Sequence, residues 1–277
     1  MPRLRHIINL WTLVEHPSKA KEWSLERKLR EVKDAGFDGF TAALTPEHHR
    51  LGEKLDLIRV GYFSSGNPKE FAKLLKQNKD AGAHHINVQL ADHDTPTPTA
   101  IKLARQLMAD GRKLGVEPAI EVHRDTCTET PEKTYALADG YKKVTGELLP
   151  MTWDYSHLAI VKHLQPPYWD RLGVRPDLIQ RAQQFHFRPF NGHHCQVPVT
   201  DGRGHLTPEV LDYLPFVQKV METWLATATP EREMFAVPEM GPLWLGYNLR
   251  AFPSSWKEAV VLRGEIEKCW RKAMKRS

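Results

Sequence analysis

The sequence alternates eight times between a short apolar run and a longer stretch whose apolar residues have helical spacing. A chain in which strands alternate with helices places its strands in a parallel sheet. Eight such units predict a closed α/β barrel, the (β/α)8 or TIM-barrel fold. The predicted strands cover residues 6–11, 38–42, 57–63, 86–90, 118–123, 150–154, 183–187 and 234–239.

The stretches between these runs carry start and stop signals for helices. In the first one, Leu25, Leu29 and Val32 have helical spacing, Ser24 precedes them as an N-cap, and Gly36 ends the segment. The segment after the sixth strand is broken by prolines at 166, 167 and 176, which indicates short helices there. Further helices are predicted at residues 47–55, 67–81, 99–114, 130–144, 207–226 and from 254 onward.

The main alternative to a barrel is an open, doubly wound parallel sheet. That fold is expected to carry a glycine-rich phosphate-binding turn after its first strand, and residues 11–16 contain no glycine. The chain also has no linker-like or low-complexity segment between its halves. We therefore expect one barrel domain that spans residues 1–277.

Composition limits the class of protein. A hydrophobic fraction of 41% and a charged fraction of 26% are ordinary for a soluble globular domain. Cys127, Cys195 and Cys269 are odd in number and have no CxxC spacing, which favours free thiols in a reducing compartment. The apolar run at 7–14 is too short to span a membrane, so we expect a cytoplasmic protein without a membrane partner.

The formal net charge of +5 weakly favours a phosphate-bearing, acidic or nucleic-acid partner. Much of the basic excess lies at residues 263–276, where it is typical of the solvated face of a terminal helix. The charge by itself therefore gives little reason to expect a nucleic-acid partner.

Ionisable residues stand at the carboxyl ends of the last four predicted strands, where TIM barrels carry their catalytic groups. A buried carboxylate is costly unless it is paired or bound to a metal. Each of these residues alone could form a salt bridge with a loop arginine or lysine, but the shared position of all four favours a cation. Oxygen ligands with one imidazole suit Mn²⁺ or Mg²⁺, with Co²⁺ and Zn²⁺ as alternatives. The predicted metal ligands are Glu121, Asp154, His186 and Glu239.

This order of Glu, Asp, His and Glu, together with the segment Asp154-Tyr-Ser-His157, resembles the metal site of the xylose-isomerase-like superfamily. That group includes sugar and sugar-phosphate isomerases and epimerases, inosose dehydratase and endonuclease IV. The resemblance implies an isomerase or epimerase that binds one divalent metal ion, with Mn²⁺ expected first, and acts on a small sugar-like substrate. A homo-oligomer is left open.

The resemblance also implies roles for individual residues. Glu121 and Glu239 would act as the two bases of a proton transfer through an enediolate, and His157 and Arg188 would contact the substrate. Arg188 could instead only neutralise the carboxylates. His123 lies on the same strand face as Glu121 by period-two alternation and could line the pocket. The residues that follow Glu121 differ from the Asn-Arg that follows the first glutamate in the ketohexose epimerases. This difference argues against a simple epimerase of that kind.

Other functions use the same fold. A dehydratase or lyase of a keto-sugar or inosose would pass through the same intermediate. An abasic-site nuclease would need extra zinc ligands, and the spacing of Asp201 and His205 does not match its motif. A non-catalytic sugar-binding barrel would not require both Glu121 and Glu239.

The remaining features allow more than one interpretation. The loop at 189–205 could act as a lid, and its adjacent His193, His194 and Cys195 could hold a second metal, although neighbouring residues rarely converge on one ion. The histidine pairs at 48–49 and 84–85 are expected to lie away from the chemistry. Four aromatic residues near strand ends could stack on a sugar or belong to the core, namely Trp11, Trp153, Trp244 and Tyr247.

Overall fold

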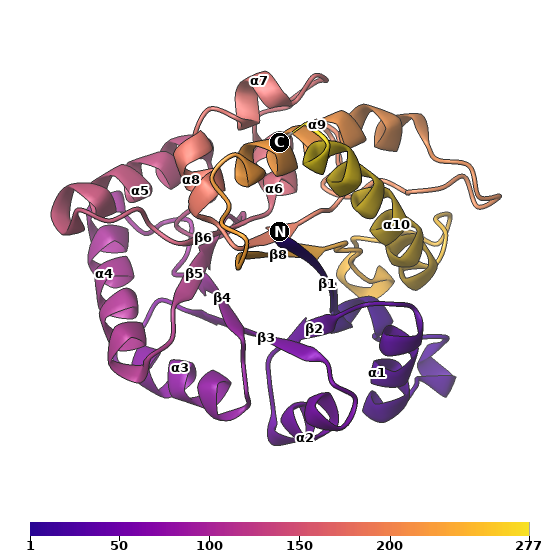
Figure 1. Cartoon of the computed structure of the whole chain (residues 1–277), viewed down its shortest axis with the longest axis horizontal. Coiled ribbons are helices and arrows are strands. Elements are labelled where there is room, and N and C mark those ends of the chain that lie inside the picture. Colours follow the sequence, from indigo (N-terminus) through magenta and orange to yellow (C-terminus); the bar gives the residue numbers. More distant parts are fainter. Residues whose placement is uncertain (277) are drawn as a thin grey trace.

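Eight parallel strands close into a barrel in which every strand pairs with the strands that precede and follow it, and β1 pairs with β8 (Figure 1). The computed structural model describes residues 1–276. The closed barrel confirms the predicted (β/α)8 fold and is inconsistent with the open-sheet alternative. The strands are β1 (Arg3–Asn9), β2 (Gly39–Ala42), β3 (Ile58–Ser65), β4 (His85–Leu90), β5 (Pro118–Glu121), β6 (Met151–Trp153), β7 (Gln184–His186) and β8 (Glu233–Val237).

Helices surround the barrel in Figure 1, and several of them begin where the sequence has a start signal. Ser24 accepts a hydrogen bond from Arg27 N at the start of α1, and Thr130 accepts one from Lys133 N at the start of α5. The segment rich in prolines after β6 forms three short helices, as predicted. The helices are α1 (Leu25–Asp34), α2 (Pro46–Lys54), α3 (Phe71–Asp80), α4 (Thr97–Leu114), α5 (Pro131–Thr145), α6 (Tyr155–Val161), α7 (Trp169–Leu172), α8 (Pro176–Arg181), α9 (Pro208–Leu225) and α10 (Ser255–Met274), with 3-10 turns η1 (Leu10–Leu13), η2 (Lys19–Lys21) and η3 (Leu243–Leu245).

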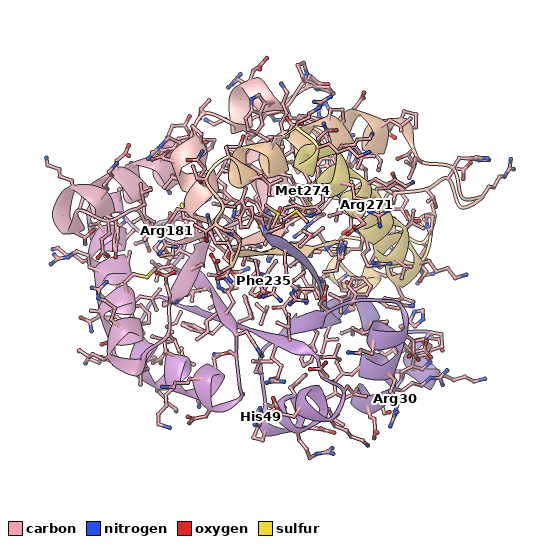
Figure 2. The ribbon with its side chains drawn as sticks, in the orientation of Figure 1. Arg30, His49, Arg181, Phe235, Arg271 and Met274 are labelled. Atoms are coloured by element: carbon pink, nitrogen blue, oxygen red, sulfur yellow. The ribbon has the colours of Figure 1, made fainter. Side chains whose placement is uncertain are left out.

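Two apolar cores hold these layers together. The larger core lies between the sheet and the helices. The smaller one fills the inside of the barrel and consists of Ile7, Val60, Phe235 and Val237. Figure 2 shows Phe235 near the middle of the barrel, whereas Arg30 and Arg271 lie on the outer helices. Among residues 1–276, no helix is both long and apolar enough to cross a membrane.

Close approach between strands requires glycine at the start of β2. A Cβ at Gly39 would lie 2.2 Å from the carbonyl oxygen of Ile58 on the neighbouring strand. Gly39 pairs with both Ile7 of β1 and Ile58 of β3, so this glycine lets three strands lie side by side at this level.

His85, at the start of β4, is a buried imidazole inside the barrel. Its ring packs edge-on against Phe235 with the ring centres 5.8 Å apart, and its Nε2 has no hydrogen-bond partner. Burial, and to a smaller extent the charge of His186, lowers the pKa of His85 to about 4. The folded protein therefore binds a proton at His85 much more weakly than the unfolded chain does.

This difference predicts a loss of stability on the acid side. Because the pKa of His85 is about 4 in the folded state and about 6.5 in the unfolded state, its contribution is lost as the pH falls from about 6.5 to 4. His85→Leu should reduce that loss by up to about 3 kcal/mol, measured as the difference between urea-unfolding curves across this pH range. The exposed His193, replaced by leucine, serves as the control and should keep the wild-type slope. An unchanged slope in His85→Leu would contradict the prediction.

Candidate metal centre

The four predicted ligands lie at the carboxyl ends of β5 to β8, on one edge of the barrel. Glu121 is the last residue of β5 and His186 the last residue of β7. Asp154 follows β6 directly, and Glu239 stands two residues beyond β8. All four side chains are buried. The parallel direction of the strands brings these positions together.

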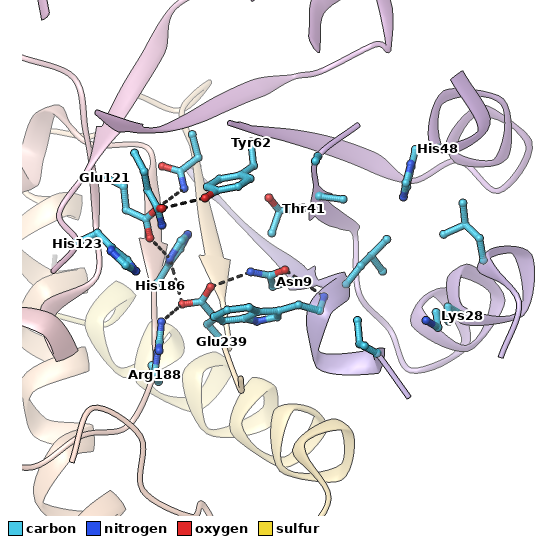
Figure 3. A pocket seen from close by; sticks show the side chains of 18 residues that line it. Asn9, Lys28, Thr41, His48, Tyr62, Glu121, His123, His186, Arg188 and Glu239 are labelled. Carbon is cyan, nitrogen blue, oxygen red and sulfur yellow. Dashed lines mark hydrogen bonds and ion pairs between the residues drawn. The ribbon is translucent and has the colours of Figure 1, made fainter. Parts of the chain in front are cut away.

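Three of the four ligands form a compact group. Glu121, Asp154 and His186 each offer one ligand atom, and these atoms lie within 4.8 Å of one another. Glu239 is not part of that group of three, but its Oε2 lies 3.2 Å from His186 Nδ1, while Glu121 Oε1 lies 3.1 Å from the same nitrogen. The two glutamates therefore both face His186 Nδ1 (Figure 3).

Arg188, two residues after His186, is the cation of this cluster. Its Nη2 donates to Asp154 Oδ2 at 2.6 Å and also to Glu239 Oε2. The guanidinium is 1% exposed and lies over the Tyr247 ring at 4.6 Å from its centre. Nε and Nη1 have no hydrogen-bond partner, and Arg188 lines the adjoining cavity. Arg188 thus bridges two carboxylates with one positive charge and retains unused donors.

Amide side chains hold one carboxylate oxygen of each glutamate, the one that does not face His186 Nδ1. Asn87 and Gln89, on β4, donate to Glu121 Oε2 at 2.8 and 3.1 Å, and Asn9, at the end of β1, donates to Glu239 Oε1 at 2.8 Å. None of these three residues is among the site residues predicted from the sequence. The sequence does contain a pattern that indicates two of them. Asn87 and Gln89 are polar residues two positions apart in an apolar strand, so they face the same side of the sheet.

Tyr62 extends the network by one further bond. Its hydroxyl donates to Gln89 Oε1 at 2.8 Å, which leaves the Gln89 amide nitrogen directed at Glu121. Burial, with smaller effects from Glu121 and Glu239, raises the pKa of Tyr62, so this hydroxyl keeps its proton. Tyr62 therefore fixes the orientation of the Gln89 amide.

The charges in the cluster stabilise one another. Burial acts to raise the pKa of Glu121, but the charge and contact of His186 outweigh it and lower that pKa to about 2. For Asp154, the Arg188 charge likewise outweighs burial and lowers the pKa, and for Glu239 His186 does so together with Arg188. Burial acts to lower the pKa of His186, but Glu239 and Glu121 raise it. All three carboxylates are therefore ionised at neutral pH.

His157 contacts Asp154 on the side away from the cavity lining. It is completely buried, its Nε2 is 3.3 Å from Asp154 Oδ2, and burial chiefly lowers its pKa to about 4. Its ring centre is 3.9 Å from that of His123, which lines the cavity. His123 thus faces the cavity, as period-two alternation predicted, whereas His157 is not among the residues that line it.

A cavity of about 410 Å³ opens beside the carboxylates. His48 of α2 lines the end of this cavity that lies opposite the carboxylates, and its ring packs on Phe40 of β2 (Figure 3). Among the aromatic candidates, Trp11 lines the cavity, Tyr247 packs on Trp11, Trp153 is buried against Tyr155, and Trp244 is exposed. The lining residues are Asn9, Leu10, Trp11, Val14, Leu25, Lys28, Thr41, Ala42, Ala43, His48, Tyr62, Asn87, Gln89, Glu121, His123, His186, Arg188 and Glu239.

The donor set fits a divalent cation. His186 Nδ1 is buried without a hydrogen-bond partner and faces two carboxylate oxygens. With His186 neutral, three carboxylates and the Arg188 guanidinium leave two negative charges uncompensated, which one divalent ion would balance. Carboxylate oxygens with one imidazole suit Mn²⁺ or Mg²⁺.

The loop at 189–205 is tied to α10. Glu258 accepts hydrogen bonds from Thr200 N at 2.8 Å and from Val199 N. Within residues 1–276, the group of Glu121, Asp154 and His186 is the one set of three such side chains close enough to hold a metal, so the alternative site in this loop has no support. The same finding argues against the metal cluster of a nuclease.

Comparison with known proteins extends the fold assignment. No protein-family model and no curated protein sequence matches the chain. Among solved structures, the chain is similar to an L-ribulose 3-epimerase, with a TM-score of 0.64, 13% identity, and coverage of 100% of this chain and 97% of that one. It is similar to a xylose isomerase-like TIM barrel protein from Mycobacterium smegmatis in complex with magnesium, with a TM-score of 0.57, 14% identity, and coverage of 90% and 88%.

A third similar structure is a probable 3-DHS dehydratase from Bacillus anthracis, with a TM-score of 0.57, 14% identity, and coverage of 94% of this chain and 98% of that one. These comparisons confirm the resemblance to xylose-isomerase-like barrels at the level of the fold.

The centre predicts metal-dependent stability. Saturating Mn²⁺ or Mg²⁺ should raise the unfolding temperature, with about 2.7 kcal/mol gained at a metal concentration of one hundred times Kd, and elemental analysis should find about one ion per chain. Asp154→Asn removes a charge yet can still cap α6, so it should lower metal affinity at least about tenfold without unfolding the protein. Glu209→Gln, at an exposed position, is the control. Equal stabilisation of wild type and Asp154→Asn would contradict the assignment.

Proposed function

We propose that this protein is a metal-dependent sugar isomerase or epimerase that removes a proton from the carbon next to the carbonyl of a sugar, sugar phosphate or keto-polyol and returns a proton to that carbon or to its neighbour. The observation that carries this proposal is the pair of buried glutamates, Glu121 and Glu239, whose carboxylates both face His186 Nδ1 beside a cavity. A divalent ion held by these three residues and Asp154 would act as a Lewis acid toward substrate oxygens and acidify the neighbouring C–H.

The two glutamates have the features that a pair of bases needs. Each carboxylate has one oxygen fixed by amides, Glu121 through Asn87 and Gln89 and Glu239 through Asn9, so neither can rotate freely. Because β5 and β8 lie on different sides of the barrel, the glutamates can address opposite faces of one substrate. One would remove a proton and the other would return it.

Substrate contacts are assigned to Arg188 and His123, with His157, which does not line the cavity, in a supporting position. Arg188 has two unused donors, Nε and Nη1, and it lines the cavity together with His123. A donor in this position would bind a carbonyl or hydroxyl oxygen of the substrate. His157 supports the same region through its contacts with Asp154 and His123.

The proton transfer predicts exchange with solvent. Metal-loaded protein incubated with candidate ketoses and inososes in D₂O should introduce deuterium next to the carbonyl, as followed by NMR. Glu239→Gln should keep its metal and reduce the exchange rate by about 100-fold or more, because removal of a positioned base costs about that much. Glu209→Gln serves as the control. Wild-type exchange in Glu239→Gln would reduce Glu239 to a metal ligand, and a dehydrated product would identify the lyase branch.

The substrate contacts predict a second set of variants. Arg188→Lys keeps a positive charge near Asp154 and Glu239 but loses the unused donors, so KM should rise about tenfold or more while metal content persists. His157→Ala should likewise weaken substrate binding and retain the metal. Loss of metal from His157→Ala, measured by elemental analysis, would show that this histidine serves the metal ligands instead.

A further inference from the structure

The cavity is larger than the carboxylate cluster and has two chemically different ends. Glu121, His186 and Arg188 lie at one end in Figure 3, whereas Lys28 and His48 lie at the other. The second end is built from η1, α1, the end of β2 and α2. It therefore belongs to the first quarter of the chain, whereas the carboxylates follow or end strands β5, β6 and β8.

Apart from Trp11, Lys28 and Thr41, the cavity-lining residues from η1, α1 and the end of β2 are aliphatic. Leu10, Val14, Leu25, Ala42 and Ala43 line this part of the cavity, and their side chains have no hydrogen-bonding groups. Sugar hydroxyl groups placed against these residues would leave water without gaining partners, which is unfavourable. Apolar groups placed there would gain from burial.

The two basic residues at this end already have partners. Lys28 Nζ bonds to the carboxylate of Glu22, and its side chain is 11% exposed. His48 Nδ1 lies 2.7 Å from Thr45 Oγ1. Because the Lys28 charge is balanced by Glu22, a phosphate or carboxylate of the substrate would have to compete with an acidic residue. The methylene stem of Lys28 instead adds to the apolar wall.

We infer that the substrate carries an uncharged apolar group next to its metal-chelating portion, and that the aliphatic wall from η1 to α2 binds this group. The substrate class is then a keto-sugar conjugate with an alkyl or aryl substituent, rather than a free sugar or a sugar phosphate. This inference rests on the proposed function, because the wall is continuous with the cavity that contains Glu121 and Glu239.

Hydroxamic acids test this inference without knowledge of the sugar. They chelate a metal through two adjacent oxygens, so acetohydroxamic acid probes the metal centre alone. A series with a phenyl group on one to three methylenes probes the centre and the wall together. With Mn²⁺-loaded protein in a calorimeter, the best phenylalkyl compound should bind about 10- to 100-fold more tightly than acetohydroxamic acid.

Variants locate the effect. Leu25→Asn replaces apolar surface with an amide of the same branched shape near the start of α1, so the preference for phenylalkyl compounds should fall at least about fivefold while acetohydroxamic acid binds as before. Ala43→Trp should block the wall with the same result. Leu211→Asn, at an exposed leucine near the start of α9, is the matched control and should keep the full preference.

Equal affinity for acetohydroxamic acid and every phenylalkyl compound, in protein shown to hold its metal, would overturn the inference. So would tighter binding of succinic monohydroxamic acid than of the phenylalkyl series, which would identify an acid-binding end at Lys28. Failure of the protein to bind Mn²⁺ in the metal titration would instead remove the proposed function, and this inference with it.

Discussion

Three carboxylates packed into the end of a barrel repel one another, and the structure around them compensates for that repulsion. Arg188 bridges Asp154 and Glu239, and His186 faces both glutamates. Breaking one partner of such a cluster would leave a buried charge uncompensated, which is far more costly than losing a surface salt bridge. The cluster therefore restricts which side chains the surrounding strands can carry.

The amides of the first half of the barrel meet this restriction. Asn9, Asn87 and Gln89 point donors at the glutamates and add no charge, so they hold the carboxylates without neutralising them. Strands β1 to β4 and the segments that follow them thus support the metal centre and form the aliphatic wall of the cavity. Strands β5 to β8 provide the ionisable groups. The contact of Asn9 with Glu239 depends on barrel closure, which places β1 beside β8, whereas Asn87 and Gln89 reach Glu121 because β4 pairs with β5, the next strand in the chain.

The chain is similar in fold to solved structures with which it shares only 13–14% of its residues. The fold therefore requires a particular amino acid at few positions. The likeness lies in the fold, in which eight strands alternate with helices. The aliphatic wall of the cavity consists of small and aliphatic residues in loops and at the starts of helices. At such positions a barrel can vary its sequence without disturbing its core.

The sequence by itself determined the barrel, since eight alternating units leave few other ways to bury their apolar faces, and all eight predicted strands are present. It also determined that Glu121, Asp154 and His186 meet, because parallel strands end at one edge. Only the tertiary structure decided the pairing of Asn9 with Glu239, which are 230 positions apart, and the place of His48 in the lining of the cavity. Such contacts depend on barrel closure and on the face that a helix turns inward, and both are set by the packing of the whole chain rather than by local pattern.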